Sequence, residues 1–413
     1  MTESSETSGD PSFAAGFSLL KNPNVAKMFF AYLVSYTGTA MAPIAIAFGV
    51  LELTGSTSDA SIVIAAPTLA SILILLVGGV VADRTSRKRV IYSSELLAMA
   101  AQFTLAWLFL SGTATIPWLT AFMLINGIAM AFHAPAATGL IIQLVETKDL
   151  QATNALLGTA RNGAIAGGAA LGGILVATIG AGWTLLVDAV SFGLSAALVF
   201  TLRPKKQIAL EPASVFEDLR LGWREFTSHT WLWVIVIQFS LIVAAGEAVF
   251  GLIGPAVARE QLGGAVSWGF IASGFGLGTL MGGVIAMRIR PKYPMRFATC
   301  LVFFFAGVHL TLAVPLPVFV ITIAALISGF AGQIFAVIWY TTLQQRVPAH
   351  MLSRVSAYDH LGSIVLAPLG IVVGGIMFEV VGFRTTLVIA ALTVIIPTLI
   401  TLCVRDVWRM SND

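Results

Sequence analysis

The chain has 413 residues, of which 57% are hydrophobic and 10% are charged, and its formal net charge is +3. With a mean hydropathy of +0.91, it has too few charged side chains to cover a water-soluble globule of this size. The composition therefore excludes a soluble domain and predicts an integral membrane protein.

The first segment, Met1 to Leu20, is polar and rich in serine. It has no basic stretch ahead of an apolar core, so it does not resemble a cleavable signal peptide. We expect residues 1–22 to form a disordered cytoplasmic tail, and residues 406–413 to form a second short cytoplasmic tail.

Twelve apolar segments follow, each long enough to cross the hydrocarbon core of a bilayer as a helix. Backbone groups in lipid need internal hydrogen-bond partners, and these segments lack the alternation of a barrel strand. The fold class is therefore predicted to be all-α and membrane-spanning. The predicted spans are Val25–Leu51, Ala60–Val81, Val90–Leu110, Ile116–Ala137, Leu150–Ile179, Gly182–Leu202, Trp231–Val257, Val266–Met287, Phe297–Val314, Leu316–Tyr340, Val355–Val381 and Thr385–Val404.

A charged turn joins the second span to the third, and its acidic residue precedes its basic ones. The turn contains Gly79, Asp83, Arg84, Arg87 and Lys88. A carboxylate there can accept hydrogen bonds from the start of a neighbouring helix and can pair with an arginine, which predicts a cytoplasmic gate. The alternative is a solvated turn that serves only as a topology signal.

The basic residues predict the orientation in the membrane. If both termini are cytoplasmic, all but three of the 23 lysines and arginines fall on the cytoplasmic side. The exceptions are Arg259 and Arg384 outside and Arg161 within a span. The net charge thus concerns orientation in the cell membrane, and no nucleic-acid partner is expected.

Four ionisable residues lie well inside the predicted spans, where charge is costly unless it is paired or hydrated. They are Arg161, Asp188, Glu247 and His309. The functional interpretation is that Asp188 or Glu247 binds and releases a proton, while Arg161 tunes that acid or holds an anionic substrate. Since Arg161 and Asp188 differ in depth by only about 5 Å, the alternative is a static ion pair that stabilises the first half.

Other ionisable residues near span ends are expected to meet lipid headgroups and water, which makes a role in transport less expected for them. They are Glu52, Glu95, Asp359 and Glu379. His133, just before Pro135, is expected to cap or pack at a helix break, with a proton relay as the alternative.

The chain repeats itself about its middle. The segment from Gln143 to Leu150 is echoed 202 residues later, and several glycines recur at the same shift. We therefore predict two six-helix halves, residues 23–202 and 230–405, joined by a cytoplasmic linker at residues 203–229. Within the linker, Val215–Phe226 has the spacing of an amphipathic helix on the membrane surface.

Glycines four residues apart occur in the fifth, eighth and eleventh spans, a spacing that lets helix backbones approach closely. They are Gly168 and Gly172, then Gly274, Gly278 and Gly282, and finally Gly370 and Gly374.

Together these features resemble the major facilitator superfamily over nearly the whole chain. In that family the loop after the second span reads Gly-x-x-x-Asp-Arg/Lys-x-Gly-Arg-Arg/Lys. The charged turn described above fills this pattern, although Ser86 replaces the second glycine. The segments around His133, Asn154 and Asp188 are similar to the bacterial subgroup that exports enterobactin and macrolides.

The resemblance implies two bundles related by an axis along the membrane normal, which rock about a central site to give alternating access. In the resembled fold, the second, fifth, eighth and eleventh spans meet at the seam between the halves. The seven spaced glycines are therefore predicted to line this seam. The resemblance also implies a monomer that exports an amphipathic small molecule, with the proton gradient as its energy source and no cofactor.

Other classes lack their sequence signatures. No Gly-Lys pair exists for a nucleotide-binding loop, and no nucleophile elbow or zinc-ligand cluster is present. The two cysteines, Cys300 and Cys403, have no spacing typical of a metal site or a disulfide. We predict no enzyme and no metal site. An uncoupled facilitator, an uptake symporter and a non-transporting sensor with the same fold are the alternatives to proton-coupled export.

Overall fold

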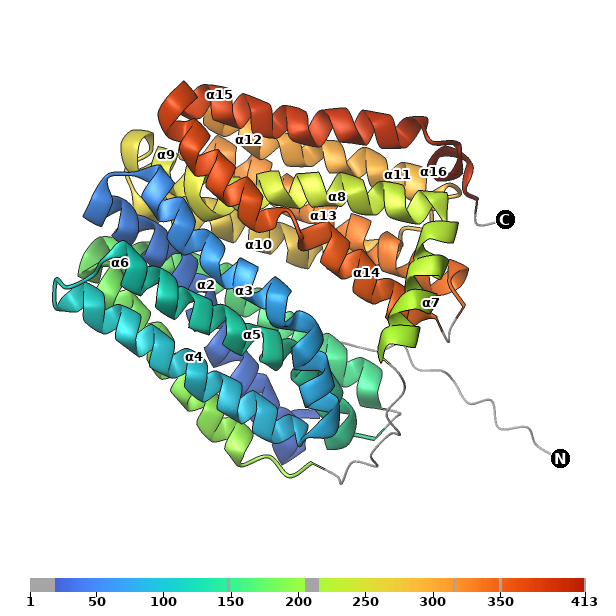
Figure 1. Cartoon of the computed structure of the whole chain (residues 1–413), viewed down its shortest axis with the longest axis horizontal. Coiled ribbons are helices and arrows are strands. Elements are labelled where there is room, and N and C mark those ends of the chain that lie inside the picture. Colours follow the sequence, from blue (N-terminus) through green and yellow to red (C-terminus); the bar gives the residue numbers. More distant parts are fainter. Residues whose placement is uncertain (1–18, 147–148, 205–214, 315, 349–350, 412–413) are drawn as a thin grey trace.

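The structure is a computed structural model that describes residues 19–146, 149–204, 215–314, 316–348 and 351–411, with only the backbone of residues 75–84, 215–219 and 353. Most of the predicted N-terminal tail lies outside these ranges. Within them, every regular element is a helix, and the helices run roughly side by side (Figure 1).

The first half consists of long helices that match the first six predicted spans. After the short turn η1 (Leu19–Lys21) come α2 (Pro23–Thr54), α3 (Thr57–Arg84), α4 (Arg87–Leu110), α5 (Ile116–Leu144) and α6 (Leu150–Phe200). The ends of α2 illustrate the local signals. The Asn22 side chain accepts a hydrogen bond from the N–H of Asn24, and Gly55 ends the helix in the left-handed conformation.

The second half is more interrupted. It follows the linker helix α7 (Val215–Ser228) and comprises α8 (Thr230–Ala248), the π-helix η3 (Val249–Ile253), α9 (Gly254–Gln261), α10 (Ala265–Ala286), α11 (Pro294–Leu301), η4 (Val302–Phe304), α12 (Phe305–Ala313), α13 (Val318–Arg346), α14 (Leu352–Ile364), α15 (Ala367–Cys403) and α16 (Arg405–Arg409). The seventh and ninth predicted spans are each assembled from three of these elements.

Two glycines turn a helix back on itself. Gly180 in α6 has a φ of 84° and Gly382 in α15 has a φ of 81°, which residues with a Cβ adopt only under strain. The turn in α15 is visible at the upper left of Figure 1. These turns stand 202 residues apart, at equivalent points of the internal repeat.

The described residues contain ten helical stretches that are long and apolar enough to cross a membrane. Two of them, Leu150–Phe200 and Arg354–Cys403, are 51 and 50 residues long and double back at the glycines just described, so each holds two spans. The predicted all-α membrane fold with twelve spans is confirmed.

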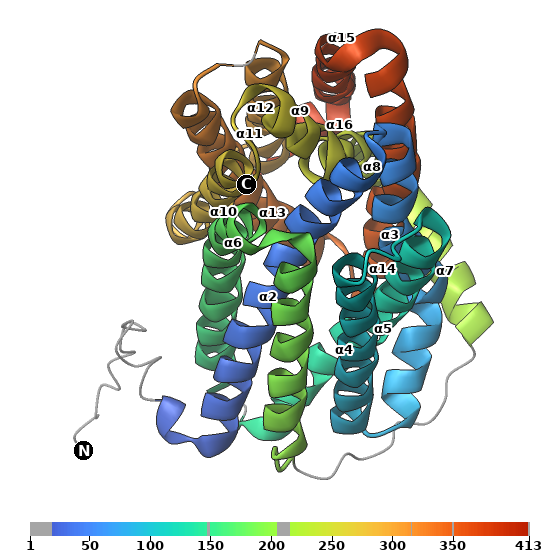
Figure 2. The ribbon, with the colours of Figure 1, turned by 90° about the vertical axis from the view of Figure 1, so that its left-hand side faces the viewer.

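Each half packs mainly within itself. In the first half α2 packs along α6, and α3 along α5; in the second half α10 packs along α13, and α15 along α8. Figures 1 and 2 show these as two adjoining groups of helices, coloured blue to green and yellow to red. Contacts between the halves run chiefly between α6 and α10 and between α3 and α15.

The buried apolar residues divide by position along the helices. We call the end that carries α7 and α16 the termini end, and the opposite end, with the turns at Gly180 and Gly382, the far end. One continuous core at the far end includes residues of both halves, from Phe48 and Leu51 to Leu252 and Trp268.

At the termini end the apolar residues form separate cores. One lies in the first half around Met28, Leu140 and Leu157, and the other lies in the second half around Ile235 and Trp339. Among the residues whose side chains are described, the two halves therefore share a core at the far end and form separate cores at the termini end, where the side chains of residues 75–84 of α3 lie outside the description.

The predicted seam is correct for the helices and wrong for the glycines. Gly168 and Gly172 face Thr37 and Met41 of α2, inside the first half. The other predicted glycines face α13 or α8 inside the second half; they are Gly274, Gly278, Gly282, Gly370 and Gly374.

The glycines that do face the opposite half lie on other helix faces. Gly173 lies against Ala265 and Gly269, and Gly375 lies against Thr57 and Ser61. Gly276 of α10 likewise lies against Ala166 of α6. Glycines four residues apart on a helix all face one neighbouring helix. The residue after each of them points about 100° away, toward a different helix.

The predicted linker helix is present as α7. Its Trp223 and Phe226 rings lie 5.4 and 6.0 Å from the Tyr358 ring of α14, and Gly222 allows α7 to approach Arg354. The linker helix is thus packed against the termini end of the second half.

Candidate functional site

The predicted gate motif lies at the turn from α3 to α4. Only the backbone of Gly79, Asp83 and Arg84 is described, so the predicted contacts of the Asp83 carboxylate stay a prediction. Arg87 lies across α5 at Gly139, where a Cβ would collide with the guanidinium.

Lys88 ties this turn to the end of the sixth span. Its Nζ donates a hydrogen bond of 2.8 Å to the carbonyl of Leu202 and lies 5.3 Å from the centre of the Phe200 ring. Lys27 donates to the carbonyl of Thr201 over 3.2 Å at the same helix end. Two cations thus meet the carbonyls that end α6, where the helix dipole favours positive charge.

Asp188 forms a buried polar centre in the first half. It is 0% exposed, and the Gln102 side chain of α4 donates to its Oδ2 over 2.6 Å. The Ser191 hydroxyl donates to its Oδ1 over 3.3 Å. On α2, Gly38 leaves the space that the carboxylate occupies, since a Cβ there would overlap Asp188 and Ser191.

Arg161 lies elsewhere in the first half. It is exposed on the first limb of α6 and acts electrostatically on Tyr36, whose ring is 5.3 Å from that of Tyr32. Within the described residues no ion pair joins Arg161 to Asp188. The static pair offered as an alternative is therefore absent from this conformation.

Glu247 and His309 lie in the second half, away from Asp188. Glu247 is exposed near the end of α8, just before η3. His309 is buried in α12, and its Nδ1 has no hydrogen-bond partner among the described residues. The structure does not bring the four predicted residues into one site.

A carboxylate and an imidazole meet instead between α4 and α5. His133 Nε2 lies 3.2 Å from Glu95 Oε1, and the exposed fractions of the two side chains are 21% and 3%. They border a pocket of about 100 Å³ that Ser35, Tyr36 and Met130 also line. The other carboxylate oxygen, Glu95 Oε2, is buried without a hydrogen-bond partner among the described residues.

The sequence interpretation of Glu95 as an edge residue underestimated its depth. Glu95 is the ninth residue of α4, about 12 Å from the helix start, and it is nearly fully buried. One signal was available: Glu95 and Gln102 are seven residues apart and therefore share a helix face.

A third polar cluster joins the two halves at the far end. Glu379 of α15 accepts hydrogen bonds from the hydroxyls of Ser56 and Ser58, at 2.8 and 2.6 Å, and from the backbone N–H of Ser58, at 3.0 Å. The hydroxyl of Thr57 donates to the carbonyl of Gly375 over 2.8 Å.

We call these five residues the far-end latch. Ser56 and Ser58 flank Thr57, the first residue of α3, so the carboxylate of one half caps a helix of the other. The positive end of the helix dipole favours the anion there. The latch therefore holds the halves together at the end where they already share a core.

The described residues contain no group of histidine, cysteine or acidic side chains suited to hold a metal ion. Three acidic groups in the helices, Asp188, Glu379 and Asp359, are held by protein donors. Asp359 of α14, for example, accepts a hydrogen bond of 3.0 Å from the Trp339 indole.

Comparison with known sequences gives a consistent result. The profile of a family described as transmembrane secretion effectors matches residues 14–411. The multidrug efflux pump Tap of Mycolicibacterium fortuitum is 26% identical over 391 residues, which cover 89% of this chain and 92% of that protein. The enterobactin exporter EntS of Escherichia coli is also 26% identical over 391 residues, covering 87% of this chain and 88% of that protein.

Solved transporter structures share the fold. A bacterial homologue of the human lysosomal transporter Spinster, in an inward-facing and unoccupied conformation, superposes with a TM-score of 0.72 at 14% identity, covering 91% of this chain and 95% of that chain. The nucleoside transporter NupG superposes with a TM-score of 0.73 at 13% identity, covering 94% and 99%.

Proposed function

Because the chain belongs to the transmembrane secretion effector family of the major facilitator superfamily, we propose that it exports an amphipathic small molecule in exchange for protons. It is a membrane transporter and not an enzyme. The proposal adds the direction, the coupling ion and the class of substrate.

The distribution of the apolar cores supports transport by alternating access, on which the proposed export depends. A carrier must close one end of its central path while the other end opens, and two bundles that rock against each other do so. Among the described side chains, one shared core at the far end and two separate cores at the termini end match a carrier that is closed on one side. Residues 23–202 and 230–405 are proposed as the two rocking units, with residues 203–229 as their linker.

We assign the termini end to the cytoplasm, since nearly all lysines and arginines are predicted there. The far-end latch then closes the outer side. Asp83 and the basic residues after it, at the opposite end of α3, are proposed to close the inner side in the alternate state. A carboxylate would thus help to close the carrier at each end of α3, Glu379 at its start and Asp83 at its end.

The substrate class rests on the relatives and on the composition. Tap is named for multidrug efflux and EntS for enterobactin export, and both match most of this chain. Aromatic and methionine side chains in the spans suit a large, partly apolar solute.

We propose that the protein acts as a monomer in the cell membrane.

Accumulation measurements test the proposal. Cells with and without the protein are loaded with ethidium, a macrolide or a catecholate, each with and without an uncoupler. We expect the protein to lower accumulation of at least one compound and the uncoupler to abolish the difference.

Each alternative predicts a different outcome. Lower accumulation that persists with the uncoupler would indicate an uncoupled facilitator, and higher accumulation would indicate an uptake symporter. Unchanged accumulation of all compounds, with the protein present in the membrane, would contradict export and favour a sensor.

A further inference from the structure

Polar side chains capable of holding charge or donating amide hydrogens form a column inside the first half. On α4, Glu95 and Gln102 share one face, and Gln102 holds Asp188. On α5, His133 and Asn126 are also seven residues apart. Polar groups in such a core cost about 1–3 kcal/mol each when unpaired, so a column of them calls for a functional explanation.

Several of these side chains are only partly satisfied. Glu95 Oε2, Gln102 Oε1 and Asn126 Oδ1 are buried without a hydrogen-bond partner among the described residues. Asp188 is completely buried, whereas the Glu95–His133 pair borders the pocket and His133 is partly exposed in it. The pair is thus the ionisable part of the column that a proton can reach.

We propose that Glu95 and His133 together form the site that binds and releases the coupling proton, an inference that rests on the proposed proton-coupled export. In the loaded state the coupling proton is bonded to Nε2 of His133, and this N–H group donates a hydrogen bond to Oε1 of Glu95. The imidazolium and the carboxylate then cancel, so the pair carries no net charge. In the unloaded state the imidazole is neutral and the carboxylate keeps its negative charge. One N–H bond forms on loading and breaks on release.

The surrounding charges suit such a cycle. Arg161 and Glu95 both act electrostatically on Tyr32 and Tyr36 of α2. Arg161 is thus the cation that shares these two tyrosine neighbours with Glu95. Among the described titratable groups, Tyr32 and Tyr36 of α2 feel both Glu95 and Arg161 of α6, and Asp188 accepts a hydrogen bond from Gln102, which shares a face of α4 with Glu95.

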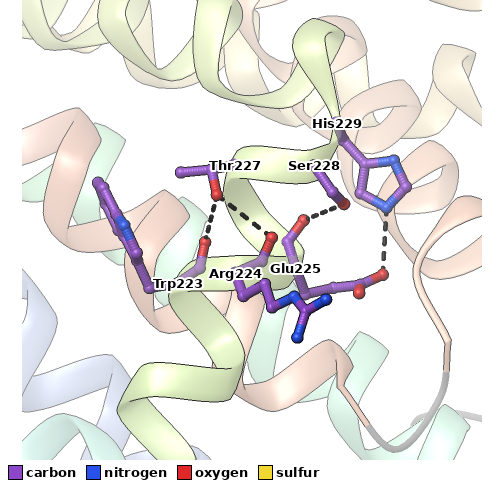
Figure 3. Close-up of polar contacts among 6 residues, drawn as sticks. All are labelled: Trp223, Arg224, Glu225, Thr227, Ser228 and His229. Atoms are coloured by element: carbon purple, nitrogen blue, oxygen red, sulfur yellow. Dashed lines mark hydrogen bonds and ion pairs between the residues drawn. The ribbon is translucent and has the colours of Figure 1, made fainter.

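The chain offers a matched control. Glu225 of α7 and His229, which precedes α8, lie 3.2 Å apart, the same distance as the buried pair, and both side chains are 27% exposed. Figure 3 shows this second pair, with the His229 ring directed at the Glu225 carboxylate. Because it lies at the termini end outside the bundle core, its proton exchange should not depend on which side of the carrier is open.

The experiment uses the full chain in liposomes with a far-end reporter. The reporter is Ser61→Cys, at a fully buried position against Gly375, with Cys300 and Cys403 replaced by serine. Labelling by a water-soluble fluorescent maleimide is measured from pH 5 to pH 9. At each pH the rate is divided by that of the detergent-unfolded protein, which removes the titration of the thiol itself.

We expect the normalised labelling rate of the reporter chain to change about tenfold across this range, because one linked proton shifts a conformational equilibrium by up to tenfold per pH unit. Glu95→Gln and His133→Asn should each flatten the profile. Glu225→Gln and His229→Asn should leave it unchanged. Thermal unfolding of each variant in detergent identifies any variant that is misfolded. One folded variant, Glu95→Gln or His133→Asn, is enough for the test.

The outcomes separate the two proposals. A reporter chain with no pH dependence would contradict proton coupling itself, and this inference with it. A pH-dependent reporter chain whose profile survives in folded Glu95→Gln or His133→Asn would overturn the assignment of the site alone. A flat profile in the control variants would also overturn it, since the effect would then not be specific to the buried pair.

Discussion

At the scale of single residues, the far-end latch shows how one carboxylate can connect two halves of a carrier. Glu379 accepts hydrogen bonds from both serine hydroxyls and from the N–H of Ser58. The first N–H groups of a helix have no partner within it, so α3 gains a cap only while the halves are closed at this end. Opening the far end must expose these groups to water.

Replacing Glu379 should therefore favour the open far end. Charge-assisted hydrogen bonds are worth more than neutral ones, but this carboxylate is exposed, so we expect Glu379→Gln to cost the closed state about 1 kcal/mol. That corresponds to about a fivefold increase in labelling of the far-end reporter. Glu52→Gln, an exposed acid at the end of α2, is the control and should leave labelling unchanged. Equal labelling in both variants would contradict a closing role for the latch.

Gly38 makes a second prediction at this scale. A methyl group at this position would overlap the carboxylate of Asp188 and the hydroxyl of Ser191. We expect Gly38→Ala to cost about 1–3 kcal/mol through overpacking and lost hydrogen bonds, measured as a lower Tm in detergent. Gly167→Ala, where the added methyl meets open space, is the matched control. Equal Tm values for the two variants would contradict the tight packing around Asp188.

At the scale of elements, the faces of α6 and α15 are divided between two tasks. The stripe with Gly168 and Gly172 lets α6 pack on α2, and Gly173, one residue on, meets α10 of the other half. In α15, Gly374 and Gly375 divide their contacts between α8 and α3 in the same way. Neighbouring glycines thus serve packing within a half and contact between halves.

Adjacent substitutions in α6 should therefore have different effects. Gly173→Ala adds a methyl against the backbone of Ala265 and Gly269, so it should push the halves apart and increase labelling of the far-end reporter. Gly172→Ala adds a methyl against Met41 within the first half, so it should lower Tm without increasing labelling. If both variants increase labelling equally, the division of the helix faces is wrong.

At the scale of the whole molecule, the proposed export requires the halves to separate at the far end and to meet at the termini end. A link across the far end should arrest the cycle whatever the substrate. We expect Ser58→Cys with Glu379→Cys, joined by a short disulfide-forming cross-linker, to lose ethidium export and to regain it on reduction. Ser111→Cys with Thr113→Cys is the control, because these hydroxyls lie 2.7 Å apart within the first half. Export by a fully cross-linked first pair would contradict alternating access.

The sequence alone determined the membrane fold, the number of spans and the internal repeat, because span length and apolar character are local properties. It also predicted the four helices that meet at the seam, through a family resemblance. It did not predict which glycines face the seam, nor that Glu95 meets His133 and that Glu379 meets Ser58.

Those pairings depend on how each helix is rotated about its axis and on its register against neighbours distant in the chain. Glu379 and Ser58 are 321 residues apart, and Glu95 and His133 are 38 residues apart. Membrane helices that are apolar on every side carry little sequence signal for that rotation. Only the tertiary structure, in which each face has found its neighbour, decided which polar groups meet.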